Sequence, residues 1–371
     1  MVYTLKWGIL ATGGIATTFA KDILADPGLR NVSDVKHEIV AVASSSSAER
    51  AKKFAEEVGA PSAAAYGNYE QLVADKNVDV IYVATPHSHH YQNAKLALEA
   101  GKNVLCEKPF TINAKQLKHL VKIAREKKLF LMEAVWTRYF PMTLELQKLL
   151  FKDRIIGKIL RVSSDLAVPF NIPNDFDPKH RMKNPELGGG ALLDLGIYSL
   201  TWIFITAFAE PENKRQAPKV NGSILFTKDT KVDEHTTVNL IFPESHVSAV
   251  ATTSMTGLSE HDNVCLIQGE KGYIKVDFPT YRPEGFTINL YQDGIKGSGK
   301  NLKTEHKSYP IPGGHGMHWE ADEVARCLRD GKLESSLMPL DESIIIAEAM
   351  DKVREVNDFK YPAALEAVDQ Y

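Results

Sequence analysis

The feature that most constrains the fold is a regular alternation of short apolar runs and amphipathic segments over the first 135 residues. Runs typical of buried strands cover residues 5–11, 38–43, 78–84, 103–106 and 129–135. Strands separated by helices form parallel sheets, because each crossover helix packs back onto the sheet. We therefore expect an α/β fold that begins with a doubly wound parallel sheet.

The pattern changes after residue 135. A helix over 141–153, an irregular stretch over 168–188 and a helix over 191–204 lead into strand candidates at 219–227, 235–242, 246–256, 263–268, 272–277 and 286–291, and helices over 317–330 and 341–357 close the chain. Short turns separate these strands, which favours an open, mostly antiparallel sheet. We expect one domain over residues 1–135 and an α+β domain over residues 136–371.

Composition excludes several classes of protein. Lys and Arg number 44 against 47 Asp and Glu, and no run of like charge stands out, which argues against nucleic acid and membrane surfaces as partners. The three cysteines are too few for a disulfide framework, and an odd number cannot all pair within one chain. The apolar stretch 195–209 is shorter than the roughly 20 residues that span a bilayer. We expect a cytoplasmic protein without a signal peptide.

A glycine turn follows the first predicted strand. Residues 11–16 read Ala11, Thr12, Gly13, Gly14, Ile15 and Ala16, which is a G-x-G-x-x-G/A frame with alanine at its first position. Such a turn presents backbone N–H groups and a helix N-terminus to a pyrophosphate. Alanine is tolerated there if its φ is negative. A plain strand–helix turn of another α/β fold is the alternative.

The end of the second strand sets cofactor preference. A carboxylate there binds a ribose 2′-hydroxyl, but this chain has Ser44, Ser45, Ser46 and then Arg50. Hydroxyl groups and a guanidinium suit a 2′-phosphate, so we expect NADP rather than NAD. Alternatively, Ser46 caps the next helix and Arg50 is only solvated.

Two further groups carry chemistry. Glu107, Lys108 and Pro109 follow a buried strand, so Lys108 emerges at the sheet edge where open α/β folds bind ligands. Asp194 and Tyr198 lie four residues apart behind three glycines, so they share one face of a helix that the glycines let approach a ligand. A surface lysine and a solvated aspartate are the alternatives.

Together these motifs resemble the Gfo/Idh/MocA family of NAD(P)-dependent oxidoreductases over nearly the whole chain. The glycine turn, Ala84-Thr85-Pro86 with His90, Glu107-Lys108-Pro109 and the three glycines before Asp194 and Tyr198 carry the resemblance. Residues 133–139 and Tyr198 are most similar to the branch with dimeric dihydrodiol dehydrogenases and fungal NADP-dependent D-xylose 1-dehydrogenases. The resemblance implies an NAD(P)-binding Rossmann domain followed by a substrate-binding and dimerisation domain.

The resemblance implies roles for individual residues. Lys108 and Tyr198 are the expected catalytic pair, and Asp194 positions Lys108 or a sugar hydroxyl. Only about 0.1% of an unperturbed tyrosine is phenolate at pH 7, and a nearby lysine increases that fraction. The cofactor-binding set is expected to be Thr12, Gly13, Gly14, Ile15, Ala16, Ser44, Ser45, Ser46, Arg50, Thr85, Pro86, His87, His90, Glu107, Lys108, Trp136 and Arg138.

The substrate pocket is expected to include Lys108, Trp136, Arg138, Phe170, Asp194, Tyr198, Phe278 and Tyr281. His87, His89 and His90 have no acidic or cysteine partner nearby in the sequence, so we expect no metal.

Three functions fit these residues. The first is NADP-dependent oxidation of an aldopyranose, with D-xylose as the expected substrate, at C1 to a lactone. The second is a dihydrodiol dehydrogenase or a glucose–fructose type of aldose oxidoreductase. The third is an NADP-sensing regulator without activity, which the retention of both Lys108 and Tyr198 disfavours. A homodimer is expected, because an extended sheet offers a face for pairing.

Overall fold

The computed structural model describes residues 2–170, 177, 179–295 and 299–368, and the chain divides into two compact units. The first unit is Met1–Tyr139, Ile311–Ala347 and Ala363–Tyr371; the second is Phe140–Pro310 and Glu348–Pro362. The predicted division into 1–135 and 136–371 is therefore too simple. Its first boundary lies within a few residues of the observed one, but two C-terminal segments return to the first unit.

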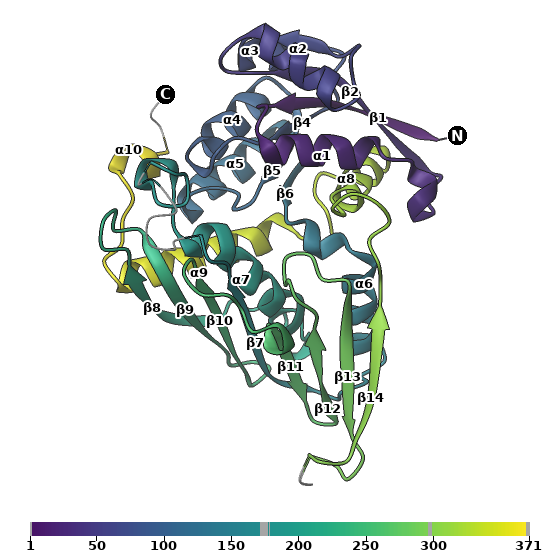
Figure 1. Ribbon diagram of the computed structural model, residues 1–371, viewed down its shortest axis with the longest axis vertical. Coiled ribbons are helices and arrows are strands. Elements are labelled where there is room, and N and C mark those ends of the chain that lie inside the picture. Colours follow the sequence, from purple (N-terminus) through teal and green to yellow (C-terminus); the bar gives the residue numbers. More distant parts are fainter. Residues whose placement is uncertain (1, 171–176, 178, 296–298, 369–371) are drawn as a thin grey trace. The chain divides into compact units, whose positions relative to one another are not determined.

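The first unit is built on six parallel strands in the order β3-β2-β1-β4-β5-β6, which confirms the predicted doubly wound sheet (Figure 1). The strands are β1 (Tyr3–Leu10), β2 (Val35–Ala43), β3 (Ala64–Tyr66), β4 (Val80–Val83), β5 (Asn103–Glu107) and β6 (Leu131–Ala134). Connections run outward in opposite directions from the adjacent pair β1 and β4. Open α/β sheets bind ligands beside such a switch point, at the carboxyl ends of the strands.

Helices connect these strands. They are α1 (Gly14–Leu24), α2 (Ala48–Glu57), α3 (Tyr69–Ala74), α4 (His87–Glu99) and α5 (Ala114–Lys127), with the short 3₁₀ turn η1 (Pro27–Arg30) after α1. Side chains cap three of them: Ser47, Asn68 and Asn113 accept backbone N–H groups of α2, α3 and α5. These caps fix where each helix begins, and so fix the loops at the sheet edge.

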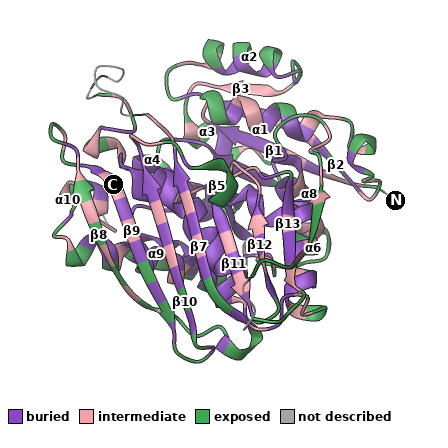
Figure 2. Cartoon of the chain, turned by 60° about the horizontal axis from the view of Figure 1, so that its bottom comes forward, coloured by how far each residue is buried: buried purple, intermediate pink, exposed green. Residues whose placement is uncertain are grey.

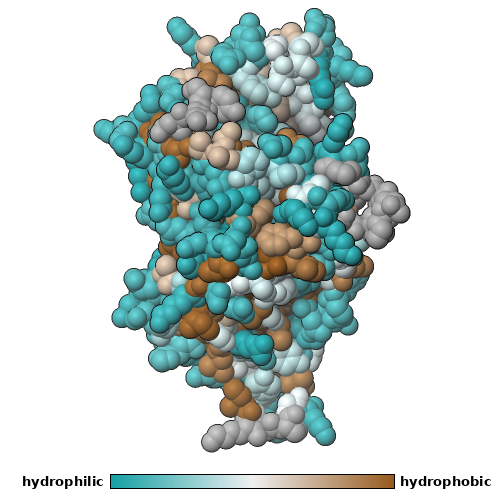
Figure 3. Space-filling view, turned by 90° about the vertical axis from the view of Figure 1, so that its left-hand side faces the viewer, coloured by the Kyte–Doolittle hydropathy of each residue, from teal (hydrophilic) through white to brown (hydrophobic). Residues whose placement is uncertain are grey.

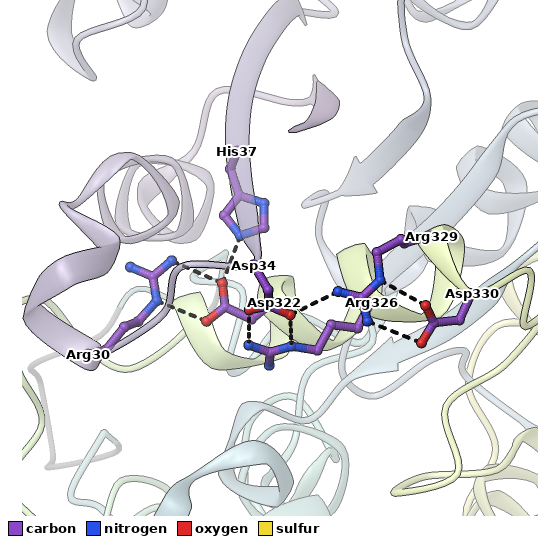
Figure 4. Close-up of polar contacts among 7 residues, drawn as sticks. All are labelled: Arg30, Asp34, His37, Asp322, Arg326, Arg329 and Asp330. Atoms are coloured by element: carbon purple, nitrogen blue, oxygen red, sulfur yellow. Dashed lines mark hydrogen bonds and ion pairs between the residues drawn. The ribbon is translucent and has the colours of Figure 1, made fainter. Parts of the chain in front are cut away.

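Helix α8 (His318–Arg329) returns to the first unit and packs on β1 and β2 beside α1. Arg30 donates two hydrogen bonds of 2.9 Å to the carboxylate of Asp322, and the ring of His37 lies 3.0 Å from the same group (Figure 4). The side chains of Arg30 and Asp322 are almost wholly buried. A buried charge is tolerated only when it is paired and hydrogen-bonded, so this pairing fixes where α8 docks.

The segment just before α8 is held by α1. The buried carboxylate of Asp22 accepts the backbone N–H groups of His315, at 3.0 and 2.8 Å, and of Met317, at 2.9 Å. Gly314 has a φ of +63°, and a Cβ there would lie 2.2 Å from Asp22 Oδ1. Glycine is required at this position both for its backbone and for the close approach of the carboxylate.

The last helices are α9 (Leu340–Val356) and α10 (Ala363–Glu366). Leu340 and Ala347 of α9 join the apolar core between the first sheet and α4 and α5. Gln116 Nε2 of α5 donates to the carbonyls of Leu365 and Ala367, at 2.8 and 3.0 Å. The start of α9 and the segment around α10 thus complete the first unit, whereas residues 348–362 between them belong to the second.

The second unit contains eight strands in the order β14-β13-β12-β11-β7-β10-β9-β8. They are β7 (Ile159–Ala167), β8 (Lys219–Phe226), β9 (Asp233–Phe242), β10 (Val247–Ser254), β11 (Cys265–Gly269), β12 (Gly272–Val276), β13 (Gly285–Tyr291) and β14 (Leu302–Ser308). Only β7 and β10 pair in parallel, so the sheet is mostly antiparallel as predicted. Buried and more exposed residues alternate along these strands, because one face packs on helices (Figure 2).

A continuous helical segment covers the inner face of this sheet. It consists of a π-helical turn η5 (Leu192–Gly196), the helix α7 (Ile197–Ile203) and a second π turn η6 (Phe204–Phe208), and it packs on β7 and β10. Among the described residues, one stretch is long and apolar enough to cross a membrane, Pro185–Phe208, and its apolar window is wholly buried inside the protein. The smaller helix α6 (Pro141–Gln147) and a π turn η3 (Lys148–Lys152) precede the sheet.

The buried carboxyl group of Glu133, on β6, should make the stability of the first unit depend on pH. Its side chain is 3% exposed and accepts the N–H of Phe110 at 3.0 Å, and burial raises its pKa to about 7. The folded state thus holds a proton that the unfolded state releases near pH 4, so stability should fall as the pH rises from about 4 to about 7. In Glu133→Gln this fall should be smaller, as measured by melting temperature against pH. Glu126→Gln, an exposed change on α5, should follow the wild type; an unchanged slope in Glu133→Gln would contradict the assignment.

Candidate active site

The glycine turn provides the first part of the candidate site. Helix α1 begins at Gly14 with Gly13 as its N-cap residue, and no side chain caps it. A Cβ built on either glycine would meet no atom within 4 Å, so there is open space beside the turn. The first amides of a helix have no intrahelical partner, which makes this end suited to a pyrophosphate.

Ala11 departs from the expectation for this turn. Its φ is +94°, not negative, so the alanine occupies a backbone region that glycine normally fills. Its N–H donates to the carbonyl of Ala43 at 3.1 Å, which holds it in place between β1 and the turn. Such a conformation costs about 1 kcal/mol or more for a residue with a side chain. The turn therefore keeps the shape of the glycine motif at some expense in stability.

The serine run and Arg50 lie next to the turn. Arg50 Nε donates to Thr12 Oγ1 at 3.2 Å, and the hydroxyl groups of Ser44 and Ser46 are 2.9 Å apart. Ser45, Ser46 and Arg50 are exposed, whereas Ser44 is buried. The cap of α2 is Ser47, one residue later than the sequence suggested. The alternative role for Ser46 is therefore wrong, and these groups form a polar corner suited to a phosphate.

His90 joins two loops at the sheet edge. Its Nε2 is 2.8 Å from the carbonyl of Thr85, and its Nδ1 is 2.8 Å from the carbonyl of Pro109. Burial, with the nearby charges of His87 and Lys108, lowers its pKa to about 3. The ring is therefore neutral at pH 7, so its single N–H donates to one of these two carbonyl oxygens while the ring also contacts the other turn, Thr85–Pro86 or Lys108–Pro109.

Glu107 supports the backbone of Lys108. Its Oε2 accepts the N–H of Lys108 at 3.2 Å, and its Oε1 accepts the hydroxyl of Tyr82 at 2.5 Å. Glu107 is 5% exposed, and burial together with its charge raises the pKa of Tyr82 well above the usual value. These bonds favour a positioning role for Glu107 over the direct cofactor contact that was expected.

The residues just after β6 are buried. Trp136 begins a 3₁₀ turn η2 (Trp136–Tyr139) and is 8% exposed. Arg138 is 3% exposed; it pairs with Glu342 at 2.5 Å and donates to the carbonyl of Leu337 at 3.2 Å. The expectation that Arg138 faces cofactor or substrate is therefore not supported, because α9 and the loop before it bury its guanidinium.

The second unit carries Asp194 and Tyr198. They lie in η5 and α7, in one continuous helical segment, and are 6% and 8% exposed. The carboxylate of Asp194 accepts hydrogen bonds from both terminal nitrogens of Arg181, at 3.1 and 3.5 Å. Arg181 was not predicted, because it comes from the stretch 168–188, which the sequence marks only as irregular. Part of this stretch lies outside the described residues.

Aromatic side chains flank Tyr198. The ring of Tyr281 lies 5.7 Å from that of Tyr198, and one turn along α7 the indole of Trp202 donates to the carbonyl of Thr280 at 2.8 Å. Phe278 instead stacks on His261, with ring centroids 4.0 Å apart. The ring of Tyr281 thus lies beside that of Tyr198, while Phe278 contacts His261, and the pocket roles of Tyr281 and Phe278 stay predictions. Phe170, half-buried just after β7, is the last described residue before position 171.

Asp233, which was not predicted, holds the start of the helix that carries Asp194 and Tyr198. Its buried Oδ2 accepts the N–H of Leu192 at 2.5 Å and the hydroxyl of Thr236 at 3.0 Å, and burial raises its pKa to about 7. Gly190 has a φ of +124°, and a Cβ there would lie 1.9 Å from Asp233 Oδ1. This glycine therefore makes room for a carboxyl group, not for the ligand that the three glycines suggested.

Comparisons with known proteins agree with this arrangement. A family model described as an oxidoreductase family with an NAD-binding Rossmann fold, GFO_IDH_MocA, matches residues 5–135, and a GFO/IDH/MocA C-terminal domain model matches residues 145–275. The chain is 49% identical to D-xylose 1-dehydrogenase (NADP(+)) of Hypocrea jecorina, over 97% of this chain and 94% of the relative. It is 36% identical to trans-1,2-dihydrobenzene-1,2-diol dehydrogenase of Danio rerio, over 94% and 96%.

A solved structure shares the fold. The 3-ketoreductase from Actinomadura kijaniata, crystallised with NADP and TDP-benzene, superposes with a TM-score of 0.75 at 23% identity, over 95% of this chain and 97% of that one. The two family models cover both the glycine turn with Lys108 and the helix with Asp194 and Tyr198. The chain therefore belongs to the Gfo/Idh/MocA family of oxidoreductases.

Proposed function

We propose that this protein oxidises D-xylose at C1 with NADP⁺ as hydride acceptor and gives D-xylonolactone. The observation that carries the proposal is the 49% identity, over 97% of the chain, to a D-xylose 1-dehydrogenase that uses NADP. The open glycine turn and the polar corner of Ser44, Ser46 and Arg50 support NADP as the cofactor.

The chemistry divides between two side chains. Bound NADP⁺ supplies the acceptor for the hydride from C1. Tyr198 accepts the proton of the C1 hydroxyl, and the cationic Lys108 favours the phenolate form that does so. The buried network of Glu107 and His90 holds the backbone of Lys108 at the sheet edge. The ring of Tyr281 lies beside that of Tyr198, which supports a place for both in the substrate pocket.

A second activity is favoured by one observation. Seven trans-1,2-dihydrobenzene-1,2-diol dehydrogenases, from fish, amphibian and mammalian sources, are 32–36% identical over 94–96% of this chain. A glucose–fructose type of transfer and an inactive NADP sensor are the further alternatives.

An assay of NADPH formation with D-xylose, D-glucose, other aldoses and a trans-dihydrodiol distinguishes these functions. Rapid NADPH formation with D-xylose and slower formation with the others is the expected result. Faster turnover of the dihydrodiol would shift the assignment to the second activity. Binding of NADP without turnover of any compound would favour the sensor.

Tyr198→Phe should lower kcat with D-xylose by about a hundredfold or more, because a positioned general base contributes about 10²–10⁴-fold. Its dissociation constant for NADP, measured by fluorescence titration, should stay within about twofold of wild type, since the ring remains. Tyr273→Phe, on β12 of the same unit, is the matched control and should keep full turnover. A Tyr198→Phe enzyme with nearly normal kcat would end the proposed role.

Arg50→Ala should raise KM for NADP by about tenfold or more and leave KM for NAD almost unchanged, because only NADP carries the 2′-phosphate that a guanidinium would bind. Lys53→Ala, an exposed change on the same helix, controls for the loss of one positive charge. Equal effects of Arg50→Ala on both cofactors would contradict the assignment.

Two further features remain proposals. A homodimer is supported by the eight-stranded sheet, whose outward residues on β8 and β9 include exposed Leu225 and Ile241. Hydrophilic residues cover most of the face in Figure 3, with hydrophobic ones exposed among them. A solution mass of a single 41.2 kDa chain at micromolar concentration would exclude the dimer. A cytoplasmic location is consistent with three buried, unpaired cysteines, and fluorescence microscopy of the tagged protein would test it.

A further inference from the structure

The ion pair of Arg181 with Asp194 brings a charge to the candidate site that no motif predicts. The two terminal nitrogens of Arg181 lie 3.1 and 3.5 Å from the two carboxylate oxygens of Asp194. The Asp194 side chain is 8% exposed, whereas that of Arg181 is 50% exposed. The pair is therefore bidentate, and it joins a buried carboxylate to a half-exposed guanidinium. This geometry is the one in which arginine binds a carboxylate most specifically.

The carboxylate needs such a partner because of its neighbour. Asp194 precedes Tyr198 by four residues in one continuous helical segment, and Tyr198 is 8% exposed. A negative charge close to a phenol disfavours the phenolate, so an unpaired Asp194 would oppose proton acceptance by Tyr198. A positive charge paired with the carboxylate offsets this effect.

The other charged groups of the segment do not replace Arg181. Lys183 pairs with Asp229 at 2.6 Å, so its charge is directed elsewhere. His180 responds to the same pair: burial lowers its pKa first, the charge of Arg181 lowers it further and Asp194 opposes the shift. His180 is therefore predominantly neutral at pH 7, whereas Arg181 brings a cation from this segment to Asp194.

We propose that Arg181 is a positioning residue for the oxidation, which neutralises and orients Asp194 so that Tyr198 accepts the substrate proton near neutral pH. The inference rests on the proposed function for its turnover assay. It assigns a purpose to the Arg181 ion pair, and it explains how an acidic residue is tolerated beside a tyrosine that must act as a base.

Arg181→Gln tests the proposal through a pH profile. The rising limb of kcat/KM with D-xylose should move to higher pH by about one unit, since one unpaired charge at this range changes a pKa by about that amount. The loss at pH 7 should be about tenfold and should recover as the pH rises. Binding of NADP should be unchanged. Arg181→Lys keeps the charge and should restore most of the wild-type profile.

A double-mutant comparison shows whether Arg181 acts through Asp194. In an Asp194→Asn background there is no carboxylate to neutralise, so adding Arg181→Gln should produce no further shift. Arg154→Gln is the matched control, because it removes an arginine that pairs with Glu210 at 2.6 Å elsewhere in the second unit. It should leave the limb in place. An unshifted profile in Arg181→Gln, or an equal shift in both backgrounds, would overturn the proposal.

A measurement without substrate separates this inference from the proposed function. The phenolate absorbance of Tyr198 can be titrated as the difference between each variant and its Tyr198→Phe counterpart. Arg181→Gln should move this titration to higher pH even if D-xylose is not the substrate. A shift in the absorbance with no turnover of D-xylose would refute the substrate and keep the role of Arg181. An absorbance titration that stays in place would refute that role.

Discussion

The first unit depends on a buried chain of polar contacts that joins residues from both ends of the sequence. The indole of Trp7 can only donate, and it donates to His37 Nδ1 at 3.1 Å. The proton of the neutral ring must therefore be on Nε2, which faces Asp322 at 3.0 Å, while Arg30 neutralises the same carboxylate (Figure 4). Burial lowers the pKa of His37, consistent with this tautomer. Losing either charge would strand the other in a dry core, which typically costs about 3–5 kcal/mol.

Much of the fold follows from local patterns, and the exceptions have local causes. Five of the six parallel strands could be expected because runs such as residues 78–84 are apolar on both faces, whereas the three-residue strand β3 was missed. Strand β7 was missed because Ser163, Ser164 and Asp165 interrupt its apolar pattern, and β14 because its side chains are mostly exposed and polar. The return of α8 could not be predicted, since the contacts that fix it join residues about 290 positions apart.

The candidate site divides in the same way. Lys108, Tyr198 and the glycine turn stand in short motifs at the ends of predicted elements, where chemistry and position coincide. Arg181 comes from an irregular segment and binds the carboxylate of Asp194, and Asp233 comes from the start of a strand and accepts the backbone N–H of Leu192. No periodicity in the sequence marks either residue. Arg138 shows the reverse error: its place after a strand suggested a ligand, but Glu342 neutralises it from a helix far along the chain.

The return of residues 311–347 and 363–371 has a consequence for how the protein is made. The ribosome completes all of residues 140–310 before it produces the helix that pairs with Arg30 and the backbone amides that Asp22 accepts. Until then the nascent first unit lacks the helix that packs beside α1 on β1 and β2, and the side chains of Arg30 and Asp22 lack the partners with which they are buried. A nascent chain that lacks this helix exposes apolar surface, so we expect chaperones to bind it until synthesis is complete. For the same reason, the nucleotide-binding half cannot be isolated by cutting the gene after residue 139; an autonomous version must carry the distant segments on a shortened linker.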